Sequence, residues 1–482
     1  MTDKNNLSKF IELMSQEISD SDLELVNLGK SLGLDLVSFK TLRDSQDDKF
    51  VDEIRNRAIK RLKQNNENLL KSSDLFYAGS IDFMVCEEPD GKSFFLLETN
   101  GGSNRGLSIL TRKQQEIIYD GYLHAIFQAL ENNKKDDGKA LILVGVPIND
   151  GLIHEKVLMI EYFRKKLRNK GYSVGIYDIN SFSKDFIEDI VFLIADYKQL
   201  STELRFTDNW VIIKDSKISV LIGDGIARRL HNNTFQKLVI EDFRKINSLI
   251  VNPIFKITDD KSLTYLASYY AKDILKKYRL KYLRFTKAYS EEELLEKLKY
   301  ACNTYRKPFI IKPNGGSGGA GVIPIAPESD LITIRNCVEI SKDEFFGKFM
   351  KNRNPYPYTI QEMADFSLID WKNGKHTFDI RIYLSQQNEN EITPIGGLAR
   401  IARGVYKGNL IKDEFVVNLS GFNGQIEVER GQGLSEKTAK LLNLTIDDFV
   451  NLFCISVVMF KSIAENYKEI INFKDWDKLI GE

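Results

Sequence analysis

Apolar residues recur at helical spacing through residues 1–75, as in the pair Phe10 and Leu13. The pattern then changes to that of two strands, residues 77–87 and 93–98, which are joined by a Pro-Asp-Gly-Lys turn. The spacing therefore predicts a helical N-terminal region that leads into a β-hairpin.

A different rhythm begins after the charged segment near residue 135. Residues 140–146 form a continuous apolar run, residues 154–170 have the spacing of an amphipathic helix, and residues 173–177 are again strand-like. Strand, helix and strand in this order form a βαβ unit, which requires parallel strands with a helix packed on the sheet. We predict a Rossmann-like domain over residues 139–255.

Beyond residue 255, helices and strands follow one another without a repeating order. Helices are expected over 261–277, 290–302 and 434–470, and strands over 308–311, 322–325, 358–362, 378–385, 392–400 and 414–418. The predicted fold class is therefore α/β, with α+β parts. The changes of pattern divide the chain into segments 1–75, 76–135, 139–255, 256–355 and 356–482.

Composition narrows the class of partner. The 482 residues include 68 basic and 68 acidic side chains, so the chain lacks the basic excess typical of nucleic-acid or membrane-surface binders. No apolar run approaches the ~18 residues of a membrane span, and the polar N-terminus lacks the apolar core of a signal peptide. We expect a cytoplasmic protein that acts on small molecules, with no nucleic acid and no membrane, and leave a homodimer open.

The spacing of cysteines and histidines does not favour a zinc site or a disulfide framework. The four cysteines contain no Cys-x-x-Cys pair, and no two of the four histidines stand four residues apart. We interpret the cysteines as buried, reduced thiols.

The most informative stretch is a lysine followed by a glycine-rich loop between two apolar strands. Lys312 ends the first strand, and five of the seven residues 315–321 are glycine. Glycines let the backbone curl so that its N–H groups face phosphate oxygens, and the lysine adds a positive charge. Because a strand follows the loop, the pattern is neither the Walker nor the Rossmann phosphate loop, both of which precede a helix. The alternative is a flexible surface loop with a solvated lysine.

The segment Lys-Pro-Asn-Gly-Gly-Ser-Gly-Gly-Ala-Gly at 312–321 resembles the phosphate loop of the ATP-grasp superfamily, which includes glutathione synthetase and D-alanine–D-alanine ligase. The resemblance implies an ATP-grasp fold preceded by a Rossmann-like domain. It also implies that ATP phosphates are bound by Lys312, Gly315, Gly316, Ser317, Gly318 and Gly319.

Two further elements match the same family. The apolar strand that ends in Gln361, Glu362 and Met363 resembles the strand that contacts adenine in ATP-grasp proteins, which implies that role for these three residues. Asp260-Lys261 resembles the helix-opening element whose lysine also reaches the phosphates, which implies a phosphate contact for Lys261. Each element also has a purely structural interpretation. The strand that ends in Gln361 can be an ordinary core strand, and Asp260 can mark a helix start that the helix dipole favours.

Arginines on the following predicted strands match family positions that contact the transferring phosphoryl group. Asp379 and Arg381 stand two residues apart on a predicted strand, so their side chains share a face. In glutathione-synthetase-like members the matching arginine contacts the γ-phosphate or the acyl phosphate, and Arg400 and Asn418 match two more positions. The resemblance thus implies catalytic roles for Lys312, Arg381 and Arg400 and a nucleotide contact for Asn418, because guanidinium groups suit the charge of a transferring phosphoryl group. The alternative for each of these arginines, considered by itself, is a charge on the protein surface.

The carboxylates that would bind Mg²⁺ are expected after Asn418, but no strand pair ending in Glu-x-Asn follows it. The hairpin near the N-terminus carries that pattern instead, with Asp82 on its first strand and Glu98 and Asn100 at the end of its second. Residues two apart on a strand share a face, as oxygen ligands of one ion should. Glu414 is an alternative ligand, and closure of a loop is the alternative role of Glu98 and Asn100.

We therefore predict a circularly permuted ATP-grasp fold that binds ATP and two Mg²⁺ ions, for which Mn²⁺ can substitute. Such a permutation would bring the two ends of the chain near each other.

The resemblance implies an ADP-forming carboxylate–amine ligase. A substrate carboxylate would attack the γ-phosphorus of ATP, and an amine would attack the acyl phosphate to give an amide or peptide bond. Carboxylate and amine are expected to be amino acids or peptides. The candidate substrate contacts are Arg105, after the metal motif, and Arg228 and Arg229, at the end of a predicted parallel strand. The alternative for the adjacent pair Arg228 and Arg229 is a solvated pair on the protein surface. An ATP-grasp phosphotransferase and a non-catalytic ATP-binding scaffold or regulator remain alternatives.

Overall fold

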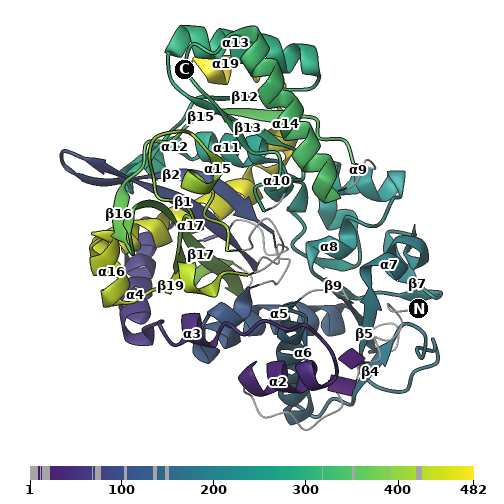
Figure 1. Ribbon diagram of the computed structural model, residues 1–482. Helices are drawn as coiled ribbons and strands as arrows, with labels where there is room; N and C mark the ends of the chain where they lie inside the picture. Colours follow the sequence, from purple (N-terminus) through teal and green to yellow (C-terminus); the bar gives the residue numbers. More distant parts are fainter. Residues whose placement is uncertain are drawn as a thin grey trace.

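The computed structural model describes residues 9–10, 12–13, 22–67, 69–70, 78–101, 106–133, 138–146, 151–316, 318–349, 353–388, 390–419 and 426–481. These residues form a mixed α/β structure built on a five-stranded parallel sheet, a seven-stranded sheet and a four-stranded antiparallel sheet (Figure 1). The predicted fold class, α/β with α+β parts, is confirmed.

The five-stranded sheet is parallel and runs in the order β10-β9-β3-β5-β4. Successive residues of its central strand β3 face opposite cores: Ile142 and Val144 pack on one side, and Leu141 and Leu143 on the other. A strand that is buried on both faces has a continuous apolar sequence, which is why the sequence pattern identified it. The strands are β3 (Ala140–Val146), β4 (Val174–Asp178), β5 (Ile190–Asp196), β9 (Val220–Ile222) and β10 (Leu249–Val251).

Helices cover both faces of this sheet (Figure 1). Two of them, α5 (Arg112–Asn133) and α6 (His154–Asn169), share the core of Ile142 and Val144. The opposite face carries α7 (Tyr197–Glu203), α8 (Asp224–Ala227) and α9 (Asn233–Asp242), followed by the 3-10 helix η2 (Phe243–Lys245). A small sheet of β6 (Arg205–Thr207), β7 (Trp210–Ile213) and β8 (Ser216–Lys217) lies in sequence between α7 and β9. The order β3–α6–β4 is that of the predicted βαβ unit.

Segments far apart in the sequence share the seven-stranded sheet, whose order is β11-β2-β1-β17-β18-β19, with β16 beside β17. Strand β1 pairs with β17 so that Asp82 lies opposite Arg381, 299 positions further along the chain. Neighbouring strands are antiparallel except for the pair β11 and β2. The strands are β1 (Ala78–Glu88), β2 (Gly91–Asn100), β11 (Leu280–Lys281), β16 (Leu368–Trp371), β17 (Gly374–Asn388), β18 (Glu391–Ile401) and β19 (Gly431–Gly433).

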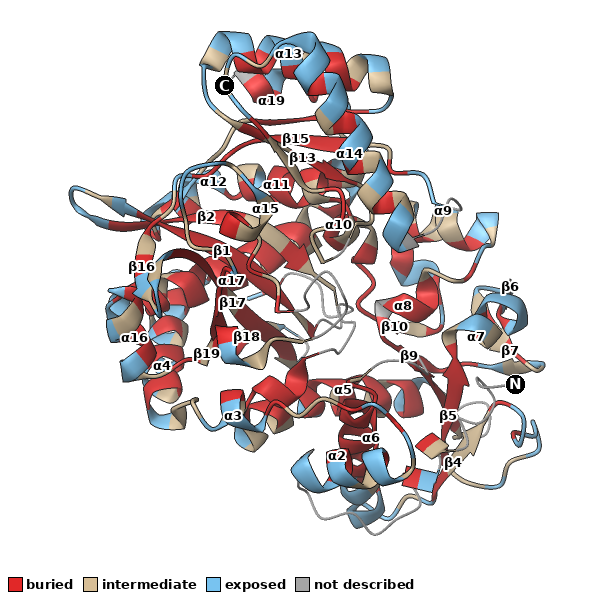
Figure 2. Cartoon of the chain, in the orientation of Figure 1, coloured by how far each residue is buried: buried red, intermediate tan, exposed pale blue. Residues whose placement is uncertain are grey.

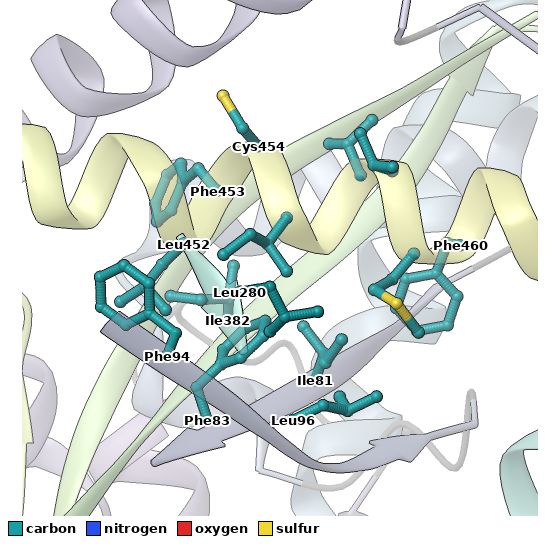
Figure 3. Close-up of a cluster of buried hydrophobic side chains, with 14 of the residues drawn as sticks. Ile81, Phe83, Phe94, Leu96, Leu280, Ile382, Leu452, Phe453, Cys454 and Phe460 are labelled. Carbon is teal, nitrogen blue, oxygen red and sulfur yellow. The ribbon is translucent and has the colours of Figure 1, made fainter. Parts of the chain in front are cut away.

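One face of the seven-stranded sheet is covered by helices. Ile81 and Phe83 of β1 and Ile382 of β17 belong to the same buried cluster as Leu452 and Phe453 of α17 (Figure 3). The helices that contribute to this cluster include α4 (Asp48–Gln64), α10 (Phe255–Asp259), α11 (Lys261–Tyr270), α12 (Lys272–Lys277), α16 (Glu436–Leu442), α17 (Ile446–Glu465) and α18 (Tyr467–Ile471). Because side chains alternate along a strand, Asp82 and Arg381 point to the opposite face.

A β-bulge sets the face on which the end of β2 presents its side chains. Phe83 pairs with Leu96, yet Asp82 pairs with Glu98, so Leu97 is the extra residue of the bulge. Opposed residues of antiparallel strands share a face, so Glu98 lies with Asp82 and not with the core residue Leu96. Without the bulge, the alternation of the strand would turn Glu98 toward the helices.

The four-stranded sheet carries the glycine-rich loop between two of its strands. Its order is β12-β15-β13-β14, and all its pairs are antiparallel. Helices α13 (Glu291–Tyr305) and α14 (Leu331–Phe349) pack against it. The strands are β12 (Phe285–Ala288), β13 (Phe309–Pro313), β14 (Ile323–Ile325) and β15 (Tyr358–Glu362). The predicted strand–loop–strand arrangement around residues 315–321 is therefore present.

Two predicted elements differ from the structure. The strand expected over 414–418 is wrong: α15 (Lys412–Phe415) occupies its start, and Glu414 Oε2 accepts hydrogen bonds from the backbone N–H groups of residues 407, 408 and 409. This carboxylate fixes a turn, which the apolar pattern of 414–418 does not reveal. The single helix expected over 261–277 is two helices, α11 and α12, which are separated at Ala271.

The predicted helical N-terminal region contains α2 (Asp22–Ser31), α3 (Lys40–Arg43) and α4. Its last helix packs on α17, where the Phe50 and Phe449 rings lie 5.7 Å apart. The expected closeness of the chain ends is not found between the first and last helices that the structure describes. Helix α2 packs against α6, whereas α19 (Lys478–Gly481) packs against β12, in different parts of the molecule (Figure 1).

Among the described residues, no single helix is long and apolar enough to cross a membrane. The bent pair α16 and α17 reaches that length and composition only when the two helices are taken together, across a 94° bend. Most of the α17 side chains are buried in the core beneath the seven-stranded sheet (Figure 2).

Candidate functional site

Three regions of the chain meet at the end of strand β2. Lys261, the first residue of α11, places its Nζ 3.2 Å from Glu98 Oε2. Lys312, on β13, places its Nζ 3.5 Å from the carbonyl oxygen of Leu97, the bulged residue. The metal-motif hairpin, the helix-opening lysine and the lysine of the glycine-rich loop are thus neighbours.

Lys312 is buried, and its ammonium group is held by neutral oxygen atoms. Its Nζ donates to Gln361 Oε1 and to Tyr265 Oη, each at 2.6 Å, and the Tyr265 hydroxyl donates in turn to the Leu97 carbonyl. Burial and the nearby charge of Lys261 lower the pKa of Lys312 to about 7, against the opposing effect of Glu98. Among the described residues no carboxylate contacts the Lys312 ammonium group directly. The charge of an anion bound beside a buried cation of this kind would stabilise it.

The first turn of α11 positions Lys261. Asp260 caps the helix by accepting from the backbone N–H groups of Ser262 and Leu263, and it pairs with buried Lys287 of β12 at 2.5 Å. Aspartate is a preferred residue at a helix N-cap, where it accepts from backbone N–H groups that lack a helical partner. The helix start is thereby fixed to the four-stranded sheet, and the following lysine is directed toward Glu98.

Asp82 lies at the centre of a buried charge network. Arg381 donates to both of its carboxylate oxygens at 2.7 Å, and Arg400 donates to Oδ2 at the same distance. Although burial by itself raises the pKa of Asp82, the two guanidinium groups hold it well below its usual range. Asp82 is therefore ionised, and both of its oxygens are engaged in charge-assisted hydrogen bonds.

Arg400 bridges two carboxylates. It donates from Nε to Asp379 Oδ1 at 2.8 Å and contacts the second oxygen of Asp379 as well as Asp82. Burial raises the pKa of Asp379 to about 6, against the effect of the adjacent Arg400. The alternation of β17 and β18 puts these charges on the sheet face that points away from helix α17.

The predicted metal residues differ in how open they are to a cation. Among the described residues, no group of three or more His, Cys, Asp or Glu side chains is arranged to hold a metal ion. The side chain of Glu98 is 32% exposed, and Asn100 is half-buried beside Asp82 at 3.5 Å. Because Mg²⁺ is often held by one or two protein ligands together with phosphates and water, Glu98 and Asn100 fit a magnesium–nucleotide. Asp82 fits one only if Arg381 turns away from it.

The glycine-rich loop combines left-handed turns with close packing. Gly315, Gly318 and Gly319 have φ values of 66°, 62° and 73°, which favour glycine. A side chain at Gly315 would meet no atom within 4 Å, whereas one at Gly318 would strike Lys348 and approach Asn418. The structure thus brings Asn418 beside the loop, as a shared phosphate site requires. The backbone N–H of Gly316 bonds to the Pro313 carbonyl at 3.4 Å and closes the turn that contains Gly315. Ser317 lies outside the described residues.

The residues predicted at adenine lie at the end of strand β15, which Gln361 and Glu362 terminate and Met363 directly follows. Gln361 accepts from Lys312, and the Glu362 carboxylate pairs with Arg284 and Lys307, each at 2.8 Å. The backbone N–H groups of Glu362 and Met363 are already used in bonds to the carbonyls of residues 284 and 308. An adenine base at this strand end would therefore have to donate hydrogen bonds to backbone carbonyl oxygens, or displace the two bonds that these N–H groups already make.

Two of the predicted substrate arginines lie at the end of the parallel sheet, near the segment that leads into α11. Arg228 and Arg229 follow strand β9, where Arg228 pairs with Asp259 at 2.5 Å and Arg229 stacks on the Tyr197 ring. Arg105 lies outside the described residues. The alternative metal ligand Glu414 is buried and accepts three backbone N–H groups, which gives it a structural role.

Sequence reasoning did not assign roles to three contacting residues. Tyr265 stands four residues after Lys261, so the helical period places both on one face, and this signal was readable. The sequence pattern places Asp379 on the strand face of Arg381, but it does not reveal the contact of Asp379 with Arg400 on the neighbouring strand. The sequence around Lys287 contains no pattern that predicts its contact with Asp260, because this contact depends on how α11 packs on β12.

No protein-family model matches the sequence, and no curated protein sequence is significantly similar to it. Among solved structures, a candidate γ-glutamylcysteine synthetase from Methylobacillus flagellatus KT is 12% identical, with a TM-score of 0.44, over 87% of this chain and 94% of its own length. A glutathione synthetase-like effector from Globodera pallida is 15% identical, with a TM-score of 0.36, over 75% of this chain and 80% of its own. At these values the likenesses establish neither an activity nor a substrate for this chain.

Proposed function

We propose that this chain is an ATP-dependent carboxylate–amine ligase with a circularly permuted ATP-grasp architecture. One observation carries the proposal: Lys312 of the glycine-rich loop and Lys261 of the helix-opening element, two lysines predicted to contact phosphates, both lie at the end of the strand that bears Glu98 and Asn100. These residues come from three separate regions of the chain, and folding brings two lysines to one carboxylate-bearing strand end. Lysines beside a carboxylate and an amide are the groups that a magnesium–phosphate needs.

Each residue would have a distinct part in binding. Lys312, Lys261 and the glycine-loop N–H groups would hold the phosphates, and Glu98 and Asn100 would hold Mg²⁺, which supplies charge neutralisation of the phosphates when bound. Arg381 and Arg400 carry positive charge on the same sheet face as Glu98. They would stabilise the charge of the transferring phosphoryl group.

The chemistry follows from this arrangement of charges. A carboxylate oxygen of the substrate attacks the γ-phosphorus, and the bond between that phosphorus and the β-γ bridging oxygen breaks, which gives an acyl phosphate and ADP. The amine then attacks the acyl carbon, phosphate leaves with the C–O bond electrons, and the nitrogen loses a proton. Amino acids or peptides are the proposed substrates. No side-chain nucleophile is needed, so positioning and electrostatics do the catalysis.

The permutation is supported by the pairing of β1 with β17. The strands that bear Asp82 and Glu98 come before the glycine-rich loop in the sequence, yet they join the sheet of Arg381 and Arg400, which follow it. In an unpermuted chain the metal strands would come last.

The test is ADP release with ATP, Mg²⁺ and pooled amino acids, with mass spectrometry of the products. We expect ADP and a condensed product from the unaltered chain. Lys312→Met and Glu98→Gln should lower the rate at least about 100-fold, as expected for loss of a group that stabilises transition-state charge. The matched control is Lys299→Met on the exposed side of α13, which should retain the rate.

Two results would reject the proposal. If the chain binds ATP but releases no ADP with any amine tested, a scaffold or regulator is favoured. Transfer of phosphate to an acceptor without a new C–N bond would favour a phosphotransferase. Full turnover by Glu98→Gln would remove the metal assignment alone.

A further inference from the structure

The glycine-rich loop is bonded at its last glycine to helix α14. The backbone N–H of Gly321 donates to Glu344 Oε2 at 2.9 Å, and Ser341 Oγ donates to the Gly321 carbonyl at 2.5 Å. The two α14 side chains stand three positions apart and therefore share a helix face. Gly321 has a φ of 74°, and a Cβ there would lie 2.9 Å from the backbone oxygen of Ser341, so this approach needs glycine. Gly321 thus anchors the loop on α14.

The same Glu344 oxygen contacts a lysine from a distant part of the chain. Lys412 Nζ, on α15, lies 2.5 Å from Glu344 Oε2, and the lysine side chain is 13% exposed. Helix α15 is held on the seven-stranded sheet, where Thr377 Oγ1 of β17 donates to the Glu414 carbonyl at 2.6 Å. Helix α14 packs instead on the four-stranded sheet. The ion pair of Glu344 and Lys412 therefore connects elements of two different sheets.

The middle of the loop lies against the segment that follows Lys412. A Cβ at Gly319 would lie 3.0 Å from Val416 Cγ1, and one at Gly318 would lie 3.1 Å from Asn418 Nδ2. The loop therefore contacts the α15 segment at its middle and α14 at its end. The ion pair joins these two supports directly, so the loop, α14 and α15 form one connected unit.

The order of such a loop bears on how tightly it can bind phosphates. A loop that binds through its N–H groups must adopt one conformation, and a flexible loop loses conformational freedom at that moment. Glycines increase this entropic cost, because glycine has the widest range of backbone conformations. Contacts that order the loop beforehand reduce the cost. Glu344 can do so because it bonds to the loop backbone and to Lys412 at once.

We propose that Glu344 is a positioning residue for phosphate binding, which holds the glycine-rich loop in place through Gly321 and Lys412. The proposal rests on the proposed function, because it takes this loop to be the phosphate site. Glu344 acts through the loop backbone and touches no nucleotide atom in this role. Ser341 holds the same glycine from its carbonyl side. The alternative is an ion pair that only strengthens the fold.

The first experiment measures hydrogen exchange of the full chain without nucleotide, by mass spectrometry of peptides that cover residues 314–322. Glu344→Ala removes both of the contacts described above and should speed exchange in these peptides about tenfold. Glu344→Gln keeps an acceptor for Gly321 but loses the charge, so we expect an increase of about threefold. Exchange in peptides from the parallel sheet should stay unchanged, which separates a local effect from a loss of global stability.

Variants of the partner and a control on the same helix test the assignment. Lys412→Met should speed exchange of the loop as Glu344→Gln does, whereas Lys412→Arg keeps the charge and should retain the protection. The matched control is Glu339→Ala, because Glu339 is an exposed glutamate of α14 that pairs with Lys342. It should leave exchange of the loop unchanged. Circular dichroism and the unfolding midpoint confirm that each variant is folded.

The second experiment connects the loop to nucleotide binding. Glu344→Ala should raise the Kd of Mg–ATP, measured by calorimetry, and the KM for ATP by about tenfold each. We expect kcat to change much less, because an ordered loop favours phosphate binding in the ground state and in the transition state alike. A pair that only strengthens the fold would lower the unfolding midpoint and leave both constants unchanged.

Several outcomes would overturn this role of Glu344. Exchange of the loop could stay unchanged in Glu344→Ala, or it could rise equally in Glu339→Ala. Faster exchange throughout the chain would show a role in global stability alone, and faster exchange of the loop with unchanged Mg–ATP affinity would reject the positioning role. If Mg–ATP affinity depends on Glu344 but the chain releases no ADP with any amine tested, the positioning role stands and the ligase is rejected.

Discussion

The five-stranded and seven-stranded sheets place their charged residues differently. In the parallel sheet the charged residues of the five strands are Asp178 and Asp196, each the last residue of its strand. In the seven-stranded sheet, Asp82, Asp379 and Arg400 lie inside central strands and are buried. The first sheet is made of short local units, whereas the second joins segments 299 positions apart.

This difference separates stability from chemistry. A strand without charge can be buried on both faces at no electrostatic cost, so the parallel sheet serves as a frame whose ligand groups stand beyond the strand ends. A charge within a strand is tolerated only with partners, and Asp82 and Asp379 have theirs in Arg381 and Arg400. The buried network is costly to form, which is understandable if its charges serve a reaction.

The largest expected effect is on the buried network. Arg400→Met removes the arginine that bonds to Asp379 and leaves Asp82 with Arg381 as its one arginine partner. We therefore expect the free energy of unfolding to fall by about 3–5 kcal/mol, measured by urea denaturation at neutral pH. Arg403→Met is the control: its side chain is partly exposed and pairs with Glu427, and its loss should stay below about 1 kcal/mol. Equal losses of unfolding free energy in Arg400→Met and Arg403→Met would show that the buried network stabilises the fold no more than an ion pair on the surface.

A core truncation in the parallel sheet should act on stability alone. Leu143→Ala removes a fully buried side chain and should cost about 2–5 kcal/mol. Because Leu143 and Arg400 share no partner, the double variant should lose the sum of the two within about 0.5 kcal/mol in the same urea assay. A clear departure from additivity would contradict the separation of the two sheets.

A smaller effect is expected in the pH dependence of ATP binding. With a pKa of about 7, Lys312 loses its proton as pH rises above neutrality, while phosphates favour its charged form. ATP binding must then take up a proton, so affinity should fall by up to about tenfold per pH unit between pH 7.5 and 9. Calorimetry at constant Mg²⁺ and salt measures this slope.

Lys312→Met should bind ATP more weakly and lose that slope, whereas Lys299→Met should keep it. An unchanged slope in Lys312→Met would show that another group titrates.

The smallest expected effect is a coupling between segments distant in sequence. Thr99 and Thr264 share a buried hydrogen bond of 2.8 Å that joins β2 to α11. A double-mutant cycle with valine at both positions should give a coupling of about 0.5–1.5 kcal/mol in unfolding free energy. The comparison cycle pairs Thr99 with Thr359, which bonds to Ser262 instead and should show no coupling. Coupling of equal size in both cycles would show that general strain, and not this bond, connects the segments.

The sequence alone determined the local units. Apolar runs and helical periods were enough for β3, α6 and β15, because a buried strand or an amphipathic helix records its surroundings in its own residues. Glycines beside Lys312 indicated the loop for a similar reason, since left-handed turns need them.

Only the tertiary structure decided how these units meet. The bulge at Leu97 turns Glu98 to the face of Asp82, and the pairing of β1 with β17 gives Asp82 two arginine partners. Neither is encoded by a local period, because register and face depend on which strands are neighbours. The same holds for the meeting of Arg353 with the glycine loop, which joins residues 38 positions apart through folding alone.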